Sequence, residues 1–290
     1  MQVAFHLGVH ATDEDRLIRS LLRNREALSR QGVSIPAPGR YRAVIRQMLA
    51  PARIPVSAET DRPLLARICD DDAPRRLILS HDAFLGLPAR AISNEGFYGR
   101  ADRRAAALAG LFPEAGCEFH MALRNPATLL PTLLALSGGS DYTGFMQDLD
   151  PLRLSWVPVV QQIRQSVPRA RLVLWCDEDS PVLWGDLLQR LAGPGAALLA
   201  HGRTDRIEPL LSETGRARLR SALAAGPALA GASLRAMMAA HLERHALPGA
   251  LETEICLPGW DSELVAEMTV NYDRDTAEIA AMEGVEMVLP

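Results

Sequence analysis

The pair of residues best suited to chemistry is His81 and Asp82, directly after the apolar run Arg76–Ser80. An imidazole or a carboxylate at the end of a buried strand can act as a general base toward a ligand hydroxyl. An unperturbed histidine titrates near ~6.5 and an aspartate near ~3.9, so His81 needs less tuning than Asp82 to act at neutral pH. Both residues are candidate catalytic bases. The plainer alternative is that Ser80 or Asp82 caps a short helix.

A second candidate group surrounds Arg124, which follows the apolar segment Phe119–Leu123. Asn125 is a favoured N-cap residue and Pro126 suits the first position of a helix, so Arg124 is expected between a strand and a helix. A guanidinium there lies at the edge where α/β sheets bind ligands, and it suits a phosphate. Thr132 follows on the same helix. An arginine paired with a nearby acid explains Arg124 equally well.

The segment from His10 to Asp15 is acidic where a phosphate-binding loop would be neutral or basic. A carboxylate about 4 Å from a phosphate opposes binding by roughly 4 kcal/mol at an effective dielectric constant near ~20, and Asp13, Glu14 and Asp15 each carry one. Thr12 and Asp15 instead resemble a capping box, and acids in the first turn stabilise a helix by about 0.3–1 kcal/mol each. An ordinary capped helix is therefore the favoured interpretation.

Two sets of residues have the chemistry of metal ligands. His10, Asp13 and Asp15 could gather a divalent cation, but nothing near them in the sequence completes the six oxygen ligands that such a cation prefers. His241 and His245 have the four-residue spacing of ligands on one helix face, without a third ligand or an HExxH glutamate. We therefore predict no metal site. The four cysteines form no CxxC pair.

The composition of the chain excludes several classes of function. All 31 basic residues are arginine, so Schiff-base chemistry and the lysine ammonium of a phosphate loop are excluded. A formal net charge of -4 gives no global reason to bind nucleic acid or an anionic membrane. No secretory signal or membrane span is visible. We expect a cytoplasmic protein that binds neither nucleic acid nor a membrane, with an unknown acceptor or protein partner.

The elements that position these residues alternate along the chain. Short apolar runs typical of strands are Val3–Leu7, Arg76–Ser80, Phe119–Leu123 and Arg171–Trp175, and the chain is expected to be extended over Val33–Ile35 before Pro36. Helical patterns are Leu17–Leu28, Tyr41–Leu49, Pro63–Ile68, Ala101–Leu111, Pro126–Leu136 and Pro181–Leu191. The alternation predicts one α/β domain over residues 1–290, with a mainly parallel sheet flanked by helices within residues 1–200. Residues 201–290 are expected to be mostly helical, with one long amphipathic helix ending near Gly284.

Three segments, in this order, resemble the bacterial sulfotransferase family. They are the loop His6–Asp15 at the position of the family's phosphate loop, Leu79–Gly86, which is similar to a Ser-Ser-Glu segment, and Leu123–Pro126 with Thr132. Members of the family transfer a sulfuryl group from 3′-phosphoadenosine 5′-phosphosulfate to a hydroxyl or an amine. The resemblance implies a P-loop sulfotransferase-like fold and this donor. It also implies the roles of its matching residues: a base at His81 or Asp82, 3′-phosphate ligands at Arg124 and Thr132, and donor-loop ligands at His10 and Thr12.

The loop departs from the family pattern where the chemistry is most demanding. Ala11 stands at the lysine position, Asp13 at the glycine position, and Glu14 and Asp15 at the two hydroxyl positions. We therefore expect a diverged sulfotransferase-like protein that has lost standard phosphosulfate-donor chemistry and retains weak binding of a nucleotide 3′-phosphate. The alternative is an active sulfotransferase with an atypical donor site that acts on an unidentified hydroxyl acceptor.

Overall fold

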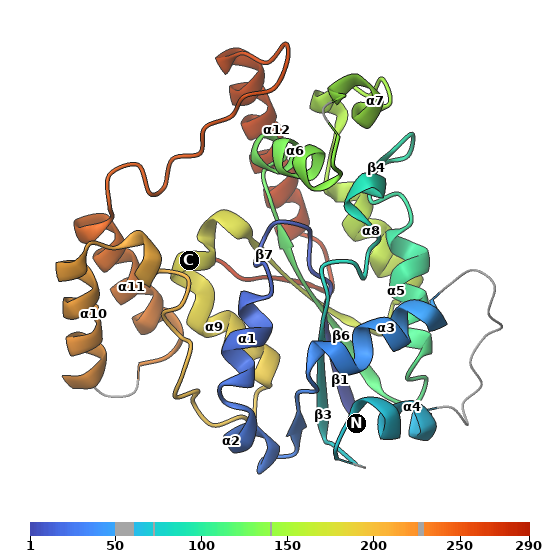
Figure 1. Cartoon of the computed structure of the whole chain (residues 1–290), viewed down its shortest axis with the longest axis vertical. Coiled ribbons are helices and arrows are strands. Elements are labelled where there is room, and N and C mark those ends of the chain that lie inside the picture. The colour runs from blue at the N-terminus through green and yellow to red at the C-terminus, as the bar shows by residue number, and fades with distance from the viewer. Residues whose placement is uncertain (50–60, 72, 140, 226–228) are drawn as a thin grey trace.

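The centre of the molecule is a six-stranded sheet in which every strand pair is parallel (Figure 1). The computed structural model describes residues 1–49, 61–71, 73–139, 141–225 and 229–290. Across the sheet the strands follow the order β2 (Val33–Ser34), β3 (Arg76–Ser80), β1 (Gln2–His6), β6 (Gly116–Leu123), β7 (Arg171–Cys176) and β8 (Val285–Met287). The first strand of the chain is therefore central, between β3 and β6.

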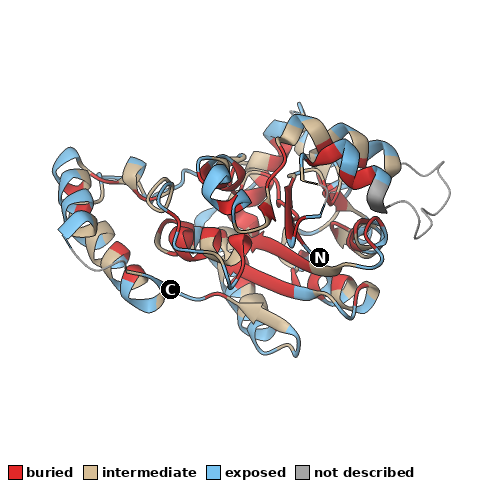
Figure 2. Cartoon of the chain, turned by 90° about the horizontal axis from the view of Figure 1, so that it is seen from below, coloured by how far each residue is buried: buried red, intermediate tan, exposed pale blue. Residues whose placement is uncertain are grey.

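The central strands bury side chains on both faces, because helices cover both sides of the sheet (Figure 2). Val3 and Phe5 of β1 belong to one hydrophobic cluster, while Ala4 between them belongs to another. The same alternation separates Leu77 from Ile78 in β3. This explains why the strands read as continuous apolar runs rather than as alternating patterns.

The larger cluster lies between the sheet and a group of six helices. In Figure 1 several of these helices lie to the right of the sheet and at its top. The six are α3 (Pro38–Met48), α4 (Asp61–Ile68), α5 (Ala101–Gly110), α6 (Pro126–Leu136), α8 (Val157–Ser166) and α12 (Ser262–Ala280). A short β4–β5 hairpin (Ile92–Ser93 and Gly96–Phe97) and helix α7 (Tyr142–Met146) border this side.

The opposite face is covered by α1 (Arg16–Leu22), α2 (Arg25–Ser29) and α9 (Ser180–Ala192). Beyond α9 lie α10 (Glu213–Ala225) and α11 (Gly231–His245), which share a small cluster of their own with Ile207 and Leu211 (Figure 1). Short 3-10 turns complete the described elements: η2 (Pro88–Arg90), η3 (Pro151–Arg153), η4 (Asp177–Asp179) and η5 (Glu208–Leu210).

The predicted α/β class with a parallel sheet flanked by helices is confirmed. The single helix expected over Leu17–Leu28 is wrong in one respect: the chain forms α1 and α2, separated at Arg23 and Asn24. Asn24 donates from its amide nitrogen to the Ser20 carbonyl at 2.9 Å, which ends α1 locally. The chain after residue 200 is mostly helical, and β8 adds a sixth strand that pairs with β7.

Candidate functional site

The carboxyl ends of β1, β3, β6 and β7 lie at one edge of the sheet, and the loops that follow them carry the candidate residues. From β1 the chain crosses to the outer strand β2 and returns to β3, and it then passes to β6 on the other side of β1. Where the direction of strand order reverses in this way, α/β proteins bind ligands in the crevice outside the carboxyl ends of the strands. We call this region the carboxyl edge.

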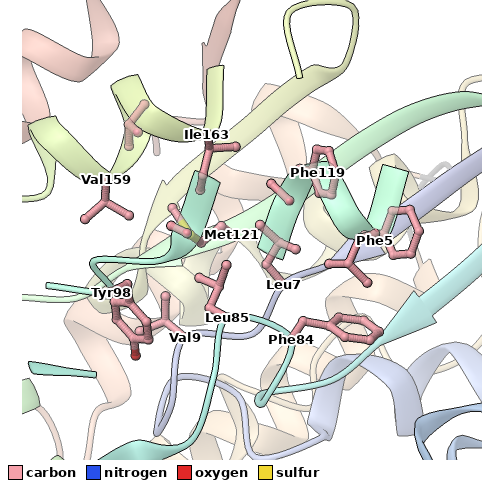
Figure 3. Packing of buried hydrophobic residues seen from close by; sticks show 14 of the residues in the cluster. Phe5, Leu7, Val9, Phe84, Leu85, Tyr98, Phe119, Met121, Val159 and Ile163 are labelled. Carbon is pink, nitrogen blue, oxygen red and sulfur yellow. The ribbon is translucent and has the colours of Figure 1, made fainter. Parts of the chain in front are cut away.

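The loop from Leu7 to Asp15 is anchored by its apolar residues. Leu7 and Val9 are buried and pack in the cluster that contains Leu85 and Met121 (Figure 3). Gly8 has a φ of +53°, and a Cβ there would lie 2.6 Å from the Asp82 Cα, so only glycine fits. The loop therefore packs directly on the backbone that carries the candidate base.

Three non-glycine residues of this loop have a left-handed backbone: Ala11 (φ 62°), Glu14 (φ 51°) and Asp15 (φ 66°). Such conformations cost energy for residues with a Cβ and persist where surrounding contacts impose them. For Ala11 and Asp15 such contacts come from side chains of distant segments, Arg124 and Arg42. The loop is thus held from outside rather than by its own conformational preference.

The start of α1 is capped by a carboxylate of the loop itself. Asp13 is buried, and its Oδ2 accepts the Leu17 N–H at 3.1 Å. The Thr12 hydroxyl donates instead to the Val9 carbonyl at 2.7 Å. Asp15, at the N-cap position, makes no side-chain cap hydrogen bond. The capping box expected from Thr12 and Asp15 is therefore wrong, because Asp13 takes that role.

Arginine side chains from three separate segments contact the loop, and we call them the loop arginines: Arg42, Arg124 and Arg206. Arg42 of α3 binds both carboxylate oxygens of Asp15 and donates to the Ser80 carbonyl at 2.9 and 3.1 Å. This pairing holds the pKa of Asp15 below its usual value. The negative charge of Asp15 is thus already balanced by the guanidinium of Arg42.

The other two loop arginines bind backbone oxygens of the loop. Arg124 donates to the Ala11 carbonyl, and its Nε donates to the Thr128 hydroxyl at 3.1 Å. Arg206 donates to the Thr12 carbonyl at 3.1 Å. The loop therefore presents carbonyl oxygens to these guanidiniums, whereas a phosphate loop presents N–H groups to its anion.

Arg206 is positioned by the segment that runs along α1. Asn24 accepts the backbone N–H groups of Ala200 and His201 at 3.1 Å, and Asp205 accepts from Ser20 and Arg23. These contacts bring residue 206 to a loop that is nearly two hundred positions away in the sequence. Nothing in the local sequence around Arg206 indicates this meeting.

Asp177, directly after β7, is a buried carboxylate beside the loop arginine Arg206. It is buried, it lies 3.7 Å from Arg206, and it accepts from the Ser180 hydroxyl at 3.2 Å. Burial raises the pKa of Asp177 to about 7, against the lowering effect of Arg206 and Arg124. Its place directly after a strand was a usable sequence signal, since the same reasoning selects Arg124.

The candidate bases His81 and Asp82 contact each other. His81 Nδ1 lies 2.8 Å from Asp82 Oδ1, and His81 is mostly buried while Asp82 is more than half exposed. This hydrogen bond lowers the pKa of Asp82, so Asp82 is ionised at neutral pH and orients the ring. The Ala83 N–H also contacts His81 Nδ1, at 3.4 Å, so this edge of the ring is held by its own loop.

His10 lies deep behind this pair rather than at the surface of the edge. It is buried, its Nδ1 lies 2.9 Å from the Tyr98 hydroxyl, and its ring stacks on the Tyr98 ring with centroids 5.9 Å apart. Burial lowers the pKa of His10, so the ring is neutral. Its observed contact is to the interior of the protein.

Arg124 and Thr132, which were expected to bind a 3′-phosphate together, form no hydrogen bond with each other. The Thr132 hydroxyl donates to the Thr128 carbonyl at 3.1 Å within α6, and Thr128 is the residue whose hydroxyl meets Arg124. Thr128 lies one helical turn after Arg124, so the sequence spacing could have indicated it.

Metal binding receives little support from the arrangement of side chains. In the parts of the chain that the structure describes, no three histidine, cysteine or acidic residues form a group that could hold an ion. His10, Asp13 and Asp15 contact Tyr98, the start of α1 and Arg42, respectively.

No helix of the described residues is long and apolar enough to cross a membrane.

Comparison with known proteins gives no match: no protein-family model, no curated protein and no solved structure is significantly similar to this chain. Function must therefore be argued from the carboxyl edge itself. Chemically, the edge offers an oriented imidazole at His81 and a loop whose hydrogen-bonding groups are mostly occupied by the protein's own side chains.

Proposed function

We propose that this chain is a diverged protein of the P-loop sulfotransferase type that has lost phosphosulfate-donor chemistry and keeps weak binding of a nucleotide 3′-phosphate. The observation that carries the proposal is the contact between the Asp13 carboxylate and the Leu17 N–H, 3.1 Å at the start of α1. A carboxylate there takes the place of a bound anion and repels a second one. The loop residues do not fit a phosphosulfate group.

The order of elements supports the family part of the proposal. A central first strand, a connecting loop and a helix are followed by strands at which the Leu79–Gly86 and Leu123–Pro126 segments meet the same edge. Residual phosphate binding rests on Arg124, whose Nε and Nη1 are engaged while Nη2 has no hydrogen-bond partner among the described residues.

Calorimetry with 3′-phosphoadenosine 5′-phosphate tests this proposal. We expect heat only at millimolar ligand, and its loss in Arg124→Gln but not in Arg153→Gln, an exposed arginine with the same charge change. Binding at micromolar ligand would overturn the loss of the donor site. Equal heat from the two variants would remove Arg124 from the site, and no heat at all would remove the residual phosphate binding.

An active sulfotransferase with an atypical donor site is the second candidate, and the hydrogen bond between His81 and Asp82 favours it. In that case His81 Nε2 would hold the proton taken from a hydroxyl acceptor, and Asp82 would orient the ring. Release of 3′-phosphoadenosine 5′-phosphate from the phosphosulfate, measured in the presence of a panel of alcohols and phenols, distinguishes the two. Turnover that falls about 100-fold or more in His81→Gln would favour the enzyme; no turnover in wild type supports the diverged binding protein.

A further inference from the structure

A pocket lined in part by charged side chains lies between α9, α11 and the segment 198–203, and none of its lining residues belongs to the carboxyl edge. Its volume is ≈ 260 Å³. The charged residues that line it are Asp186 and Arg190 of α9, Arg203, and Arg235 of α11. This size suits a small metabolite or an inorganic ion rather than a nucleotide.

The pocket carries more positive than negative charge. Three guanidiniums face one carboxylate, Asp186, and we call them the pocket arginines: Arg190, Arg203 and Arg235. Asp186 pairs with Arg235 and also accepts the Gly231 N–H at 3.1 Å, so the first N–H of α11 is already used. Arg190 pairs with Glu286 outside the pocket, but Glu286 is shared with Arg171. The three pocket arginines and Asp186 leave an excess of two positive charges. Adding Glu286 and Arg171, whose charges cancel, does not change this excess.

Arg203 is the pocket arginine with the weakest compensation. Among the described residues it forms no ion pair, and its Nη2 donates only to the Leu229 carbonyl. The Nε atoms of Arg203 and Arg235 are buried and have no hydrogen-bond partner in the described part of the chain. Both Nε atoms are closed to solvent, so an anion in the pocket would meet the Nη atoms of these side chains and offset their uncompensated positive charge.

Desolvation adds to this imbalance. Burial lowers the pKa of both Arg190 and Arg203, which means that their charged forms are less well solvated than in water. The buried Leu234 also lines the pocket and adds an apolar surface beside the arginines.

We propose that this pocket binds a small molecule that carries a phosphate group, with Arg203 and Arg235 donating to its oxygens. A phosphate monoester or inorganic phosphate is close to a dianion at neutral pH, which matches the excess of two positive charges. Its oxygens accept the paired N–H groups of a guanidinium, and arginine is the side chain best suited to that geometry. The site is independent of the carboxyl edge.

Titration calorimetry with sodium phosphate, at an ionic strength held constant with sodium chloride, tests the proposal. Wild type should bind phosphate saturably at one site, and Arg203→Gln should weaken binding by at least about tenfold. Arg218→Gln, an exposed change on α10 with the same loss of charge, should bind as wild type does. Equal weakening in Arg203→Gln and Arg218→Gln, or no saturable heat in wild type, would overturn the proposal.

A second variant guards against loss of folding in Arg203→Gln. Asp186→Asn keeps an oxygen acceptor for the Gly231 N–H but removes the only carboxylate of the pocket lining. We expect it to bind phosphate several-fold more tightly than wild type, a gain that a damaged fold would not produce. Weaker binding in Asp186→Asn would contradict an electrostatic phosphate site.

Discussion

The loop arginines and the pocket arginines differ in what their guanidiniums contact. Each loop arginine binds a carboxylate or carbonyl of the protein, as Arg42 does with Asp15. In the pocket, Arg203 lacks a carboxylate partner and two Nε atoms have no acceptor among the described residues. The loop arginines are therefore held largely by the protein's own oxygen atoms, and the pocket arginines less so.

This difference shows that the number of arginines near a site is a poor guide to anion binding. At the carboxyl edge, the loop arginines donate to oxygen atoms of the β1–α1 loop and so hold this loop in place. The pocket has no recognisable sequence pattern. Among the described residues, the Nε atoms of its Arg203 and Arg235 have no hydrogen-bond partner. What decides the capacity for an anion is the balance of donors and acceptors after folding.

The largest expected effect separates the two sets by their contribution to stability. Arg42→Ala should lower the free energy of unfolding by about 3 kcal/mol, because it leaves Asp15 unpaired and removes two donors from the Ser80 carbonyl. Arg203→Ala, measured in phosphate-free buffer, should change it by less than about 1 kcal/mol. Urea denaturation of both variants measures the contrast. Equal losses would break the distinction between the sets.

A smaller effect concerns the charge state of Asp177 beside the loop arginines. Its pKa is raised by burial from 3.8 to about 7, so the folded protein holds a proton that the unfolded chain has released. The contribution of Asp177 to the free energy of unfolding should therefore fall as pH rises between ~4 and ~7, by at least about 2 kcal/mol at ~1.36 kcal/mol per pKa unit. Asp177→Asn should flatten this dependence.

The control for Asp177 is Asp179, two positions on, which is only partly buried. Asp179→Asn should leave most of the pH dependence in place. Denaturation curves at pH 4.5, 6 and 7.5 provide the measurement, because the slope of the unfolding free energy against pH counts the protons that folding binds or releases. Because the buried histidines His6, His10 and His120 make stability rise with pH over the same range, the test is the difference between wild type and Asp177→Asn. Identical pH dependence in the two proteins would mean that the loop arginines keep Asp177 ionised.

The smallest effect tests the internal cap of α1. Asp13→Ala should cost about 1 kcal/mol of unfolding free energy, because the Leu17 N–H loses its acceptor, whereas Asp13→Asn should cost a few tenths. Glu14→Ala is the matched control, since Glu14 is exposed and meets only Arg16 at 3.3 Å. If Asp13→Ala and Glu14→Ala behave alike, the side chain of Asp13 is not the cap and the carboxyl edge is more open to an anion.

Much of the fold could be predicted from the sequence because apolar runs and helix signals are local. Strand β3 and helix α6 have the predicted bounds, and Pro126 after Asn125 fixes the start of α6, where Asn125 accepts the Ala127 N–H at 2.9 Å. The break between α1 and α2 was missed, since the amphipathic pattern continues through Asn24. Strand β8 could not be placed in the sheet, because three residues at an edge carry little periodicity.

The candidate site was predictable only in part. The residues at strand ends, His81 and Arg124, lie at the carboxyl edge as their positions indicated. The partners of the loop, Arg42 and Arg206, were not found, because they come from a helix face and from an irregular segment. Their contacts depend on how α3 and the segment along α1 pack, which no local pattern encodes.

The sequence by itself determined the α/β class, the absence of lysine and the acidic character of the β1–α1 loop. It therefore determined that a lysine-based phosphate loop could not form. The tertiary structure alone decided that Asp13 caps α1, that Asp15 meets Arg42, and that Arg203 is left without a carboxylate. The physical reason is that composition sets which charges exist, while the free energy of each charge depends on neighbours that only folding brings within hydrogen-bonding distance.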